Sequence, residues 1–272
     1  MILASSTRMF ERRTAYDLDL EGLAALLSEI GYQGIEPRRR QVNETMSPAE
    51  IVAARDSLRR HNLRCAYLNA AGLENKKALD DASRLLAVAL ALDCRLVRVQ
   101  LVRAEEIPFA QELADLAAER GMRVMSQIRS QTLFATVDMA LETLGKIGRD
   151  NFGVAFDPSD LMLDGAEDYG EGAVRRLGNR VFACFLQAYK PAPEGSELPE
   201  TIYVIGRGWL PALPGEQGSV DIPSVFRGLK AIGFNGFVVV AAPRHPQVES
   251  RNLARIWHDY LRKVMEKTGV GA

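Results

Sequence analysis

The chain has 272 residues, of which 47% are hydrophobic and 25% are charged, a composition typical of a globular protein with a sizeable core. The formal net charge of −1 argues against nucleic acid or a membrane surface as partner, because such partners select for an excess of Lys and Arg. No apolar run approaches the roughly 20 residues of a membrane span, and no signal peptide is visible. The three cysteines, Cys65, Cys94 and Cys184, lie far apart in apolar surroundings, which favours reduced thiols. We therefore expect a soluble, cytoplasmic protein.

One unit recurs along the chain: an amphipathic helix, a short turn and a short apolar strand. Helices are predicted at 20–30, 48–61, 75–92, 105–120, 131–147, 167–177, 222–232 and 247–267. Gly31 and Gly148 stand where two of these helices end, the position at which a left-handed residue costs least without a Cβ. Seven helix-to-strand junctions and an N-terminal strand over 2–6 give eight strands. This pattern predicts an α/β protein, a single-domain (β/α)8 TIM barrel over residues 1–272.

An open, doubly wound parallel sheet is the alternative architecture. The count of eight strands and the absence of a GxGxxG turn after the first strand disfavour it.

The connection from residue 188 to residue 221, between strand seven and helix seven, is longer than the others. It is rich in Gly and Pro and carries Tyr189, Tyr203 and Trp209. A loop of this length in a compact domain is typical of a lid or a binding loop. A tolerated surface insertion is the alternative.

The segment NFGVAFDPSD, residues 151–160, delivers Asp157 at the end of a predicted buried strand, and Pro158 then stops the strand. In barrels of this kind the carboxyl ends of all strands form one rim, where ligands bind. Asp157, His245 and Glu36 are the predicted catalytic residues. The predicted substrate-binding residues on this rim are Arg38, Asn69, Gln100, Arg103, Gln127, Arg129, Asp160, Gln187, Lys190, Arg207, Trp209 and Arg244.

The rim is rich in Arg although the net charge is near zero. A guanidinium binds a carboxylate or phosphate through two hydrogen bonds, so we expect a small anionic substrate. The alternative for any single Arg is that it points into water. No HxxH or HExxH spacing is present, so no metal is expected. Asp157 and Asp160 leave a hard cation such as Mn²⁺ or Mg²⁺ open as the minority alternative.

Over nearly its whole length the chain resembles the xylose-isomerase-like TIM barrels, the superfamily of sugar isomerases and epimerases that also contains endonuclease IV-type enzymes. The resemblance rests on GYQGIEP, LAAERGMRVMSQIR, FGVAFDPSDL, GNRVFACFLQAYK and GSVDIPSVFRGLKAIGFNGFVVVAA, in that order. These segments resemble the strand-two, strand-five, strand-six, strand-seven and closing segments of the family. The resemblance implies an (α/β)-barrel enzyme that moves a proton next to a carbonyl group.

The family holds one divalent metal with a Glu, an Asp, a His and a Glu from strands five to eight. The matching positions here are Gln127, Asp157, Phe185 and Ala241, so only the Asp remains. If the strand-seven match is displaced by one residue, Cys184 faces the mouth in place of Phe185. The departures put the family's metal-dependent mechanism in doubt and disfavour endonuclease action.

We therefore expect a divergent isomerase, epimerase or lyase that acts on a small anionic or polyhydroxylated, carbohydrate-like compound by proton transfer next to a carbonyl, without a metal. Guanidinium groups would take over part of the metal's electrostatic role. The alternative is a non-catalytic ligand-binding barrel or the partner subunit of an active homologue. A homo-oligomer is also compatible with the resemblance.

Overall fold

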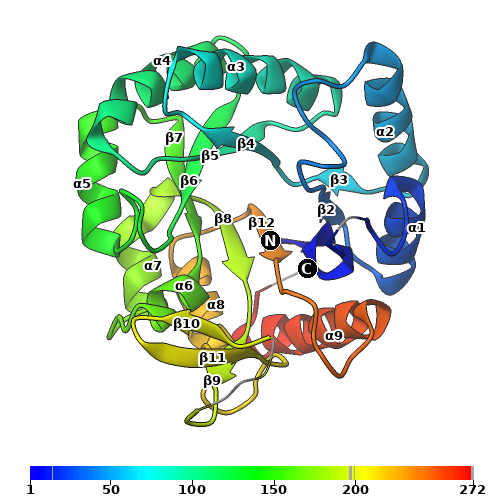
Figure 1. The fold of residues 1–272 in the computed structure, drawn as a ribbon, viewed down its shortest axis with the longest axis vertical. Helices are drawn as coiled ribbons and strands as arrows, with labels where there is room; N and C mark the ends of the chain where they lie inside the picture. Colours follow the sequence, from blue (N-terminus) through cyan, green and yellow to red (C-terminus); the bar gives the residue numbers. More distant parts are fainter. Residues whose placement is uncertain (14, 196–197, 199, 271–272) are drawn as a thin grey trace.

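The computed structural model describes residues 1–13, 15–195, 198 and 200–270. Its main sheet has nine parallel strands in the order β3-β2-β1-β12-β8-β7-β6-β5-β4, surrounded by a ring of helices (Figure 1). The strands are β1 (Ile2–Ser6), β2 (Gly34–Glu36), β3 (Arg64–Cys65), β4 (Leu68–Gly72), β5 (Leu96–Gln100), β6 (Arg123–Gln127), β7 (Phe152–Phe156), β8 (Val181–Leu186) and β12 (Phe237–Val240). The predicted TIM barrel is confirmed.

The difference between eight predicted and nine observed strands arises at one place. β3 pairs with β2, and β4 pairs with β5, but the two are separated only by Ala66 and Tyr67. They are therefore two pieces of one barrel strand that pairs on one side before this break and on the other side after it.

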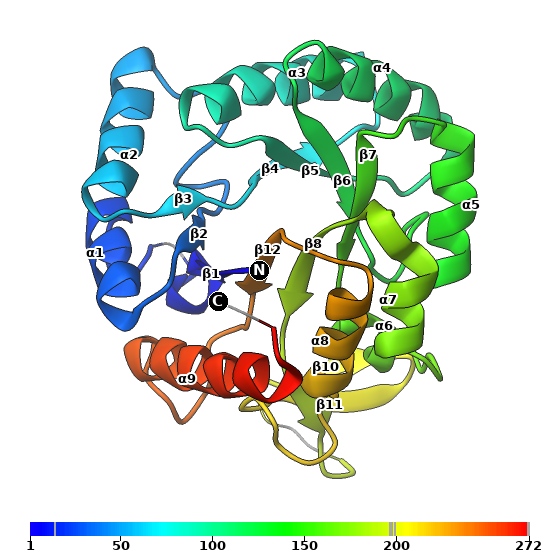
Figure 2. The same cartoon turned by 180° about the vertical axis from the view of Figure 1, so that it is seen from behind.

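The helices cover the outside of the barrel, and Figure 2 shows the same ring from the opposite end. They are α1 (Leu20–Ile30), α2 (Pro48–Arg60), α3 (Lys76–Ala91), α4 (Ile107–Ala118), α5 (Val137–Ile147), α6 (Pro158–Leu163), α7 (Glu171–Leu177), α8 (Ile222–Ala231) and α9 (Ser250–Thr268). Short 3₁₀ helices span Thr7–Phe10 (η1), Ala104–Glu106 (η2) and Gly178–Arg180 (η3). No helix in the described part of the chain is long and apolar enough to cross a membrane.

Local sequence explains where several helices begin and end. Ser47 and Glu50 form a capping box at the start of α2, which satisfies backbone N–H groups that have no partner inside the helix. Gly31 ends α1 in the left-handed region, with φ of 109°. The helix predicted from residue 131 begins only at Val137, because Thr136 caps it and Gln131 has a positive φ of 60°.

The DPSD segment, residues 157–160, begins a short helix directly after β7. The Asp157 side chain accepts hydrogen bonds from the backbone N–H groups of Ser159 and Asp160 and so caps α6. Pro158 occupies the first turn, where its missing N–H costs nothing. The segment therefore turns the chain away from β7 and places Asp160 on the rim. The helix expected from residue 167 begins at Glu171.

The long connection at 188–221 folds into a second, antiparallel sheet in the order β10-β11-β9. Its strands are β9 (Tyr189–Pro191), β10 (Ile202–Val204) and β11 (Arg207–Pro211), and residues 196, 197 and 199 lie outside the described part. Trp209 is buried against Leu163 and Tyr189. The sheet therefore forms a wall beside the carboxyl end of the barrel (Figure 1).

Candidate functional site

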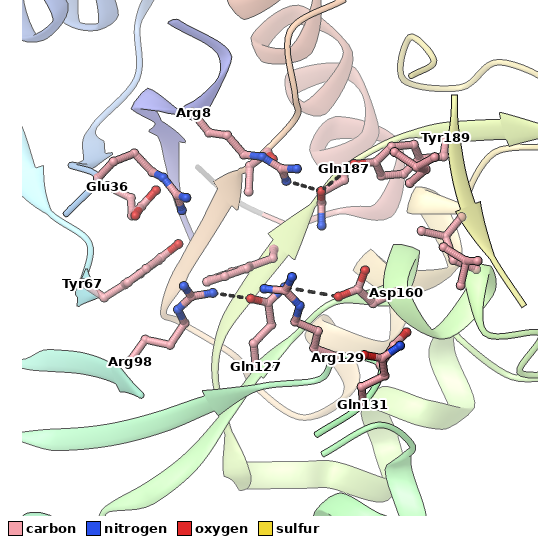
Figure 3. Close-up of a pocket in the computed structure, with 17 residues that line it drawn as sticks. Arg8, Glu36, Tyr67, Arg98, Gln127, Arg129, Gln131, Asp160, Gln187 and Tyr189 are labelled. Atoms are coloured by element: carbon pink, nitrogen blue, oxygen red, sulfur yellow. Dashed lines mark hydrogen bonds between the residues drawn. The ribbon is translucent and has the colours of Figure 1, made fainter. Parts of the chain in front are cut away.

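A cavity of about 430 Å³ opens at the carboxyl ends of the barrel strands. We call it the mouth cavity. Six of the predicted site residues line it: Glu36, Arg38, Gln127, Arg129, Asp160 and Gln187. Arg8, Tyr67, Arg98, Phe185 and Tyr189 also line it, and Figure 3 shows Arg8, Tyr67, Arg98 and Tyr189 around the same space, from different parts of the chain. Ile202 and Val204 of β10 close one side.

Asp157 lies fully buried beneath this cavity and does not line it. One carboxylate oxygen accepts from the backbone N–H groups of Ser159 and Asp160, at 3.0 and 3.2 Å. The other accepts from the side-chain amides of Gln127 and Gln187, at 2.8 and 2.7 Å. With N–H donors on both oxygens, Asp157 is placed to fix the direction of the two amides rather than to touch a ligand.

The two amides connect Asp157 to two guanidinium groups. The Gln127 carbonyl oxygen accepts from Arg98, and the Gln187 carbonyl oxygen accepts from Arg8 (Figure 3). Arg8 also donates to the backbone carbonyl of Ala241, at 3.0 Å. A guanidinium group only donates, so each arginine contacts the amide oxygen, while the amide nitrogen donates to Asp157. The network fixes the orientation of Arg8 and Arg98 on the cavity wall.

Asp160 faces the cavity above this network. Burial and the charge of Asp157 raise the pKa of its carboxyl group to about 8, against the opposing charge of Arg129. Burial also raises the pKa of Asp157, but its four N–H contacts favour the ionised form. Within this pair we therefore place the proton on Asp160 at neutral pH, where it can donate it to a ligand.

Glu36 ends β2 on the opposite side of the cavity from Asp160 (Figure 3). Its side chain is 1% exposed. One oxygen accepts from the Asn69 amide, and the other has no hydrogen-bond partner in the described part of the chain. Burial raises the pKa of Glu36, whereas the charges of Arg38 and Arg98 lower it. A buried carboxyl oxygen without a partner is costly, so its place at the cavity indicates contact with a ligand.

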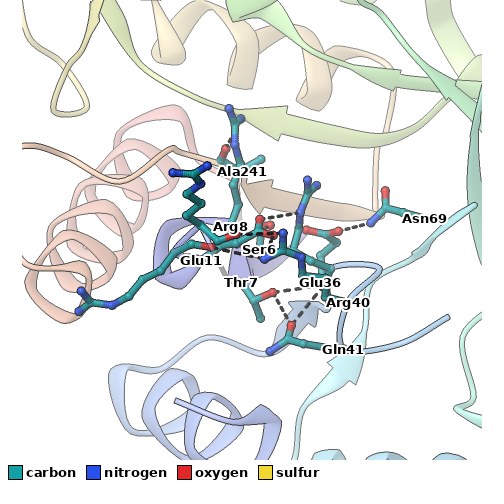
Figure 4. A network of polar contacts seen from close by, with 12 residues as sticks. Ser6, Thr7, Arg8, Glu11, Glu36, Arg40, Gln41, Asn69 and Ala241 are labelled. Atoms are coloured by element: carbon teal, nitrogen blue, oxygen red, sulfur yellow. Dashed lines mark hydrogen bonds and ion pairs between the residues drawn. The ribbon is translucent and has the colours of Figure 1, made fainter. Parts of the chain in front are cut away.

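Hydrogen bonds of the Thr7 side chain hold η1, which carries Arg8, against the loop after β2 (Figure 4). The Thr7 hydroxyl donates to the side-chain carbonyl oxygen of Gln41 at 2.6 Å, and it accepts from the Arg38 backbone N–H at 3.2 Å. The Arg38 side chain forms a loose ion pair with Glu11, at 3.6 Å.

The floor of the cavity is apolar. Phe185 stacks on Tyr67 with ring centroids 5.0 Å apart, and the Arg98 guanidinium lies 5.7 Å from the centre of the Phe185 ring. Arg98 is partly buried, and loss of solvation lowers its pKa. Arg129 has neither an ion pair nor a side-chain hydrogen bond within the described residues. Two arginines without a carboxylate partner therefore face the same space.

Other predicted site residues lie away from the mouth cavity. His245 is partly exposed, and its Nδ1 accepts from the backbone N–H of Gln247 at 3.2 Å. Burial lowers the pKa of His245. Arg244 is ion-paired with Asp17 at 2.6 Å, and Lys190 with Glu216 at 2.8 Å. The structure therefore does not bring His245, Arg244 or Lys190 to the cavity wall. His245 and Arg244 follow β12, whereas Lys190 lies on β9 and turns to Glu216.

The remaining predicted residues are also displaced. Gln100 and Arg103 are exposed, and Arg103 pairs with Glu106 at 3.3 Å. Arg207 lies exposed on β11, whereas Trp209 is buried behind the wall. Asn69 contacts Glu36 without lining the cavity. These positions correct the expectation that every residue near a strand end shares one rim, since the loops carry several of them away.

Arg8, Tyr67 and Arg98 are cavity residues that the sequence analysis did not predict. Arg8 follows β1, and the sequence analysis predicted no site residue after that strand. Arg98 stands inside the apolar stretch LVRVQ of β5. A charged residue at alternate position in a barrel strand is a signal for an inward-facing functional group.

The side chains at the family's metal positions do not fit a divalent cation. Phe185 is apolar and stacked on Tyr67, and Ala241 offers only a carbonyl that already accepts from Arg8. Gln127 is neutral and bonded to Arg98. In the described part of the chain no three His, Cys, Asp or Glu side chains are grouped to hold a metal ion. Cys184 packs in the core between sheet and helices, whereas Phe185 lines the cavity.

Comparison with known proteins identifies the relatives of this chain. Inosose isomerase from Bacillus velezensis (strain DSM 23117 / BGSC 10A6 / LMG 26770 / FZB42) is 25% identical over 251 residues, which cover 85% of each chain. A D-psicose 3-epimerase crystallised in the presence of D-fructose is 14% identical, with a TM-score of 0.77 over 100% of both chains. A xylose isomerase-like TIM barrel protein from Mycobacterium smegmatis, in complex with magnesium, is 15% identical, with a TM-score of 0.75 over 99% and 98% of the two chains.

A model of one protein family, the xylose isomerase-like TIM barrels, matches residues 24–264. This match spans most of the chain, and it agrees with the barrel topology and with the likeness to solved members. The protein belongs to the xylose isomerase-like TIM-barrel family.

Proposed function

We propose that this protein is an enzyme that transfers a proton next to a carbonyl group of a small, anionic, polyhydroxylated compound, as an isomerase or epimerase that works without a divalent metal. The observation that carries the proposal is the pair of cavity carboxyl groups, Asp160 and Glu36. Both have a raised pKa, and they stand on opposite sides of the mouth cavity (Figure 3). Perturbed carboxyl groups facing a cavity are typical of acid–base catalysis.

The two carboxyl groups suit different roles. Asp160, with its pKa of about 8, holds a proton at neutral pH and acts as the acid. Burial raises the pKa of Glu36, against the nearby positive charges of Arg38 and Arg98; a raised pKa makes its ionised form the stronger base, and we assign it this role. Removal of a proton on one side of the substrate and delivery on the other inverts a carbon next to the carbonyl. Delivery to the former carbonyl carbon, together with transfer of a proton from the adjacent hydroxyl to the former carbonyl oxygen, gives isomerisation instead.

The guanidinium groups are placed to stabilise the negative charge that develops during the reaction. Removal of a proton next to a carbonyl places negative charge on the carbonyl oxygen. Arg98 and Arg8 are already oriented by the amide network, so they can stabilise this charge without rearrangement. Arg129 and Arg38 remain to bind an anionic group of the substrate, such as a carboxylate. The relation to an inosose isomerase and the likeness to a sugar epimerase support the reaction class.

Two features favour the alternative of a non-catalytic binding barrel or a partner subunit. Phe185 and Ala241 stand where the resemblance expects metal ligands, so the ancestral chemistry is not retained in its usual form. A binding barrel, however, has no need for carboxyl groups of raised pKa on both sides of its ligand.

The test is hydrogen exchange in D₂O. The protein is incubated with uronic and keto-aldonic acids and, as neutral controls, ketohexoses, and NMR follows deuterium uptake at the carbon next to the carbonyl. We expect uptake with an anionic member and its loss in Asp160→Asn. Saturable binding of these compounds without any exchange would favour the binding-barrel alternative.

A further inference from the structure

A second cavity, of about 290 Å³, lies at the opposite end of the barrel, where the strands begin. We call it the base cavity. Arg64 and Arg123 are the first residues of β3 and β6, and Arg95 directly precedes β5. Phe182 and Phe237, at the start of β8 and β12, also line it. The proposed reaction uses none of these residues.

The three guanidinium groups are held in place without a carboxylate. Arg123 lies 4.5 Å from the centre of the Phe182 ring, and Arg64 lies 5.2 Å from the centre of the Phe237 ring. Arg95 donates to the backbone carbonyl of Arg120 at 3.0 Å. None of the three forms an ion pair with a described residue.

This arrangement contrasts with that of the other arginines. Arg59, Arg149 and Arg180, for example, each contact an Asp at 2.8 Å or less. The carboxylate that lines the base cavity, Asp93, is the partner of Arg59 at 2.7 Å. Partial burial lowers the pKa of Arg123, as expected for a cation without a counter-charge. Three like charges thus gather around one cavity with no ionic partner of their own.

All three side chains are exposed, so a small anion with several negative charges has access to them and would supply the missing counter-charge. Each guanidinium presents a rigid pair of N–H donors that matches two oxygens of a phosphate. The aromatic contacts hold the guanidinium groups of Arg64 and Arg123 in place in the absence of a ligand. We propose that the base cavity is a binding site for a small phosphate-type oxyanion, independent of the catalytic mouth. Free pyrophosphate and a phosphorylated metabolite share this chemistry.

The test is calorimetric titration of the full chain with pyrophosphate at physiological ionic strength. The double variant Arg64→Gln with Arg123→Gln removes two guanidinium groups. It is expected to weaken pyrophosphate binding at least about tenfold, because one hydrogen bond to a charged group is worth about 1.5–3 kcal/mol. Arg95→Gln is the second variant. Arg95 lies over neither Phe182 nor Phe237, so weaker binding in Arg95→Gln cannot be attributed to the exposure of an aromatic ring.

The matched control is Arg98→Gln with Arg129→Gln, which removes two guanidinium groups from the mouth cavity. Pyrophosphate binding that persists in this control and is lost in the base variants supports the proposal. Absence of binding by the wild-type protein, unchanged binding in the base variants, or loss in the mouth control would overturn it. Titration with glycerol phosphate compares the two sources of the phosphate, and tighter binding of citrate than of either would refute the phosphate class.

Discussion

Arginine side chains gather at both ends of the barrel, but the surrounding groups differ. In the mouth cavity Arg98 and Arg129 stand among carboxyl and amide groups, and burial raises the pKa of Asp160 to about 8. In the base cavity Arg64 and Arg123 lie over aromatic rings, and the carboxyl group of Asp93, which also lines it, is paired with Arg59. On this comparison the base cavity offers charge for binding alone, whereas proton transfer at the mouth would also require groups that gain and lose a proton near neutral pH.

The largest effect should come from the mouth carboxyl groups. Asp160→Asn or Glu36→Gln is expected to lower the rate of deuterium exchange by about 10²–10⁴-fold, the usual contribution of a positioned acid or base. Arg123→Gln at the base is the matched control and should leave the rate nearly unchanged. Exchange that survives in both carboxyl variants would place the chemistry elsewhere and remove the distinction between the two ends.

A smaller effect is expected from the mouth guanidinium groups. Arg129→Ala should weaken binding of an anionic substrate by about tenfold or more, the loss of a charged hydrogen bond. Arg244→Ala should change it little, because Arg244 is engaged with Asp17. The measurement is the KM of the wild type and of each variant for an anionic and for a neutral compound. An equal change for both compounds in Arg129→Ala would contradict its role as anion partner.

The pH dependence separates the two ends in another way. The kcat/KM of the wild-type enzyme should fall as the pH rises through about 8, because Asp160 loses the proton that it must donate. Binding of pyrophosphate at the base should show no dependence on Asp160. A rate that instead rises through pH 8 would reverse the acid and base roles of Asp160 and Glu36.

The same carboxyl group affects stability. Its folded-state pKa of about 8 lies above its ordinary value of 3.8, so ionisation costs stability progressively as the pH rises from about 4 to about 8. Asp160→Asn removes this cost. Thermal unfolding should show the variant gaining on the wild type as the pH rises through this window, and losing that gain in acid. A difference between the two proteins that stays constant with pH would refute the shift.

The smallest effect is expected from metal removal. The donor set at the mouth does not fit a divalent cation, so exchange activity should be the same before and after treatment with EDTA and after addition of Mn²⁺ or Mg²⁺. Metal analysis of the purified protein is the accompanying measurement. About one tightly bound metal per chain, with activity that follows it, would restore the family's usual chemistry and contradict the role given to Arg8 and Arg98.

The sequence by itself determined the barrel. Local signals such as the Ser47–Glu50 capping box and the helix-ending Gly31 act over a few residues, and the strand–helix alternation then leaves few ways to fold. It also indicated Glu36, Gln127 and Asp160 as cavity residues, because each stands directly at or after the end of a strand, where the backbone fixes direction. The absence of the family's ligands at Phe185 and Ala241 could likewise be read from the sequence.

Only the tertiary structure decided which residues meet. Asp157 seemed the natural proton carrier from its place after β7, yet two amides from other strands enclose it. His245 and Lys190 follow strands but sit on segments that turn away, and a loop path depends on long-range packing. Arg8 and Arg98 reach the cavity because the barrel closes and aligns strands far apart in the chain. A raised pKa is likewise a property of burial and neighbours, which appear only when the chain is folded.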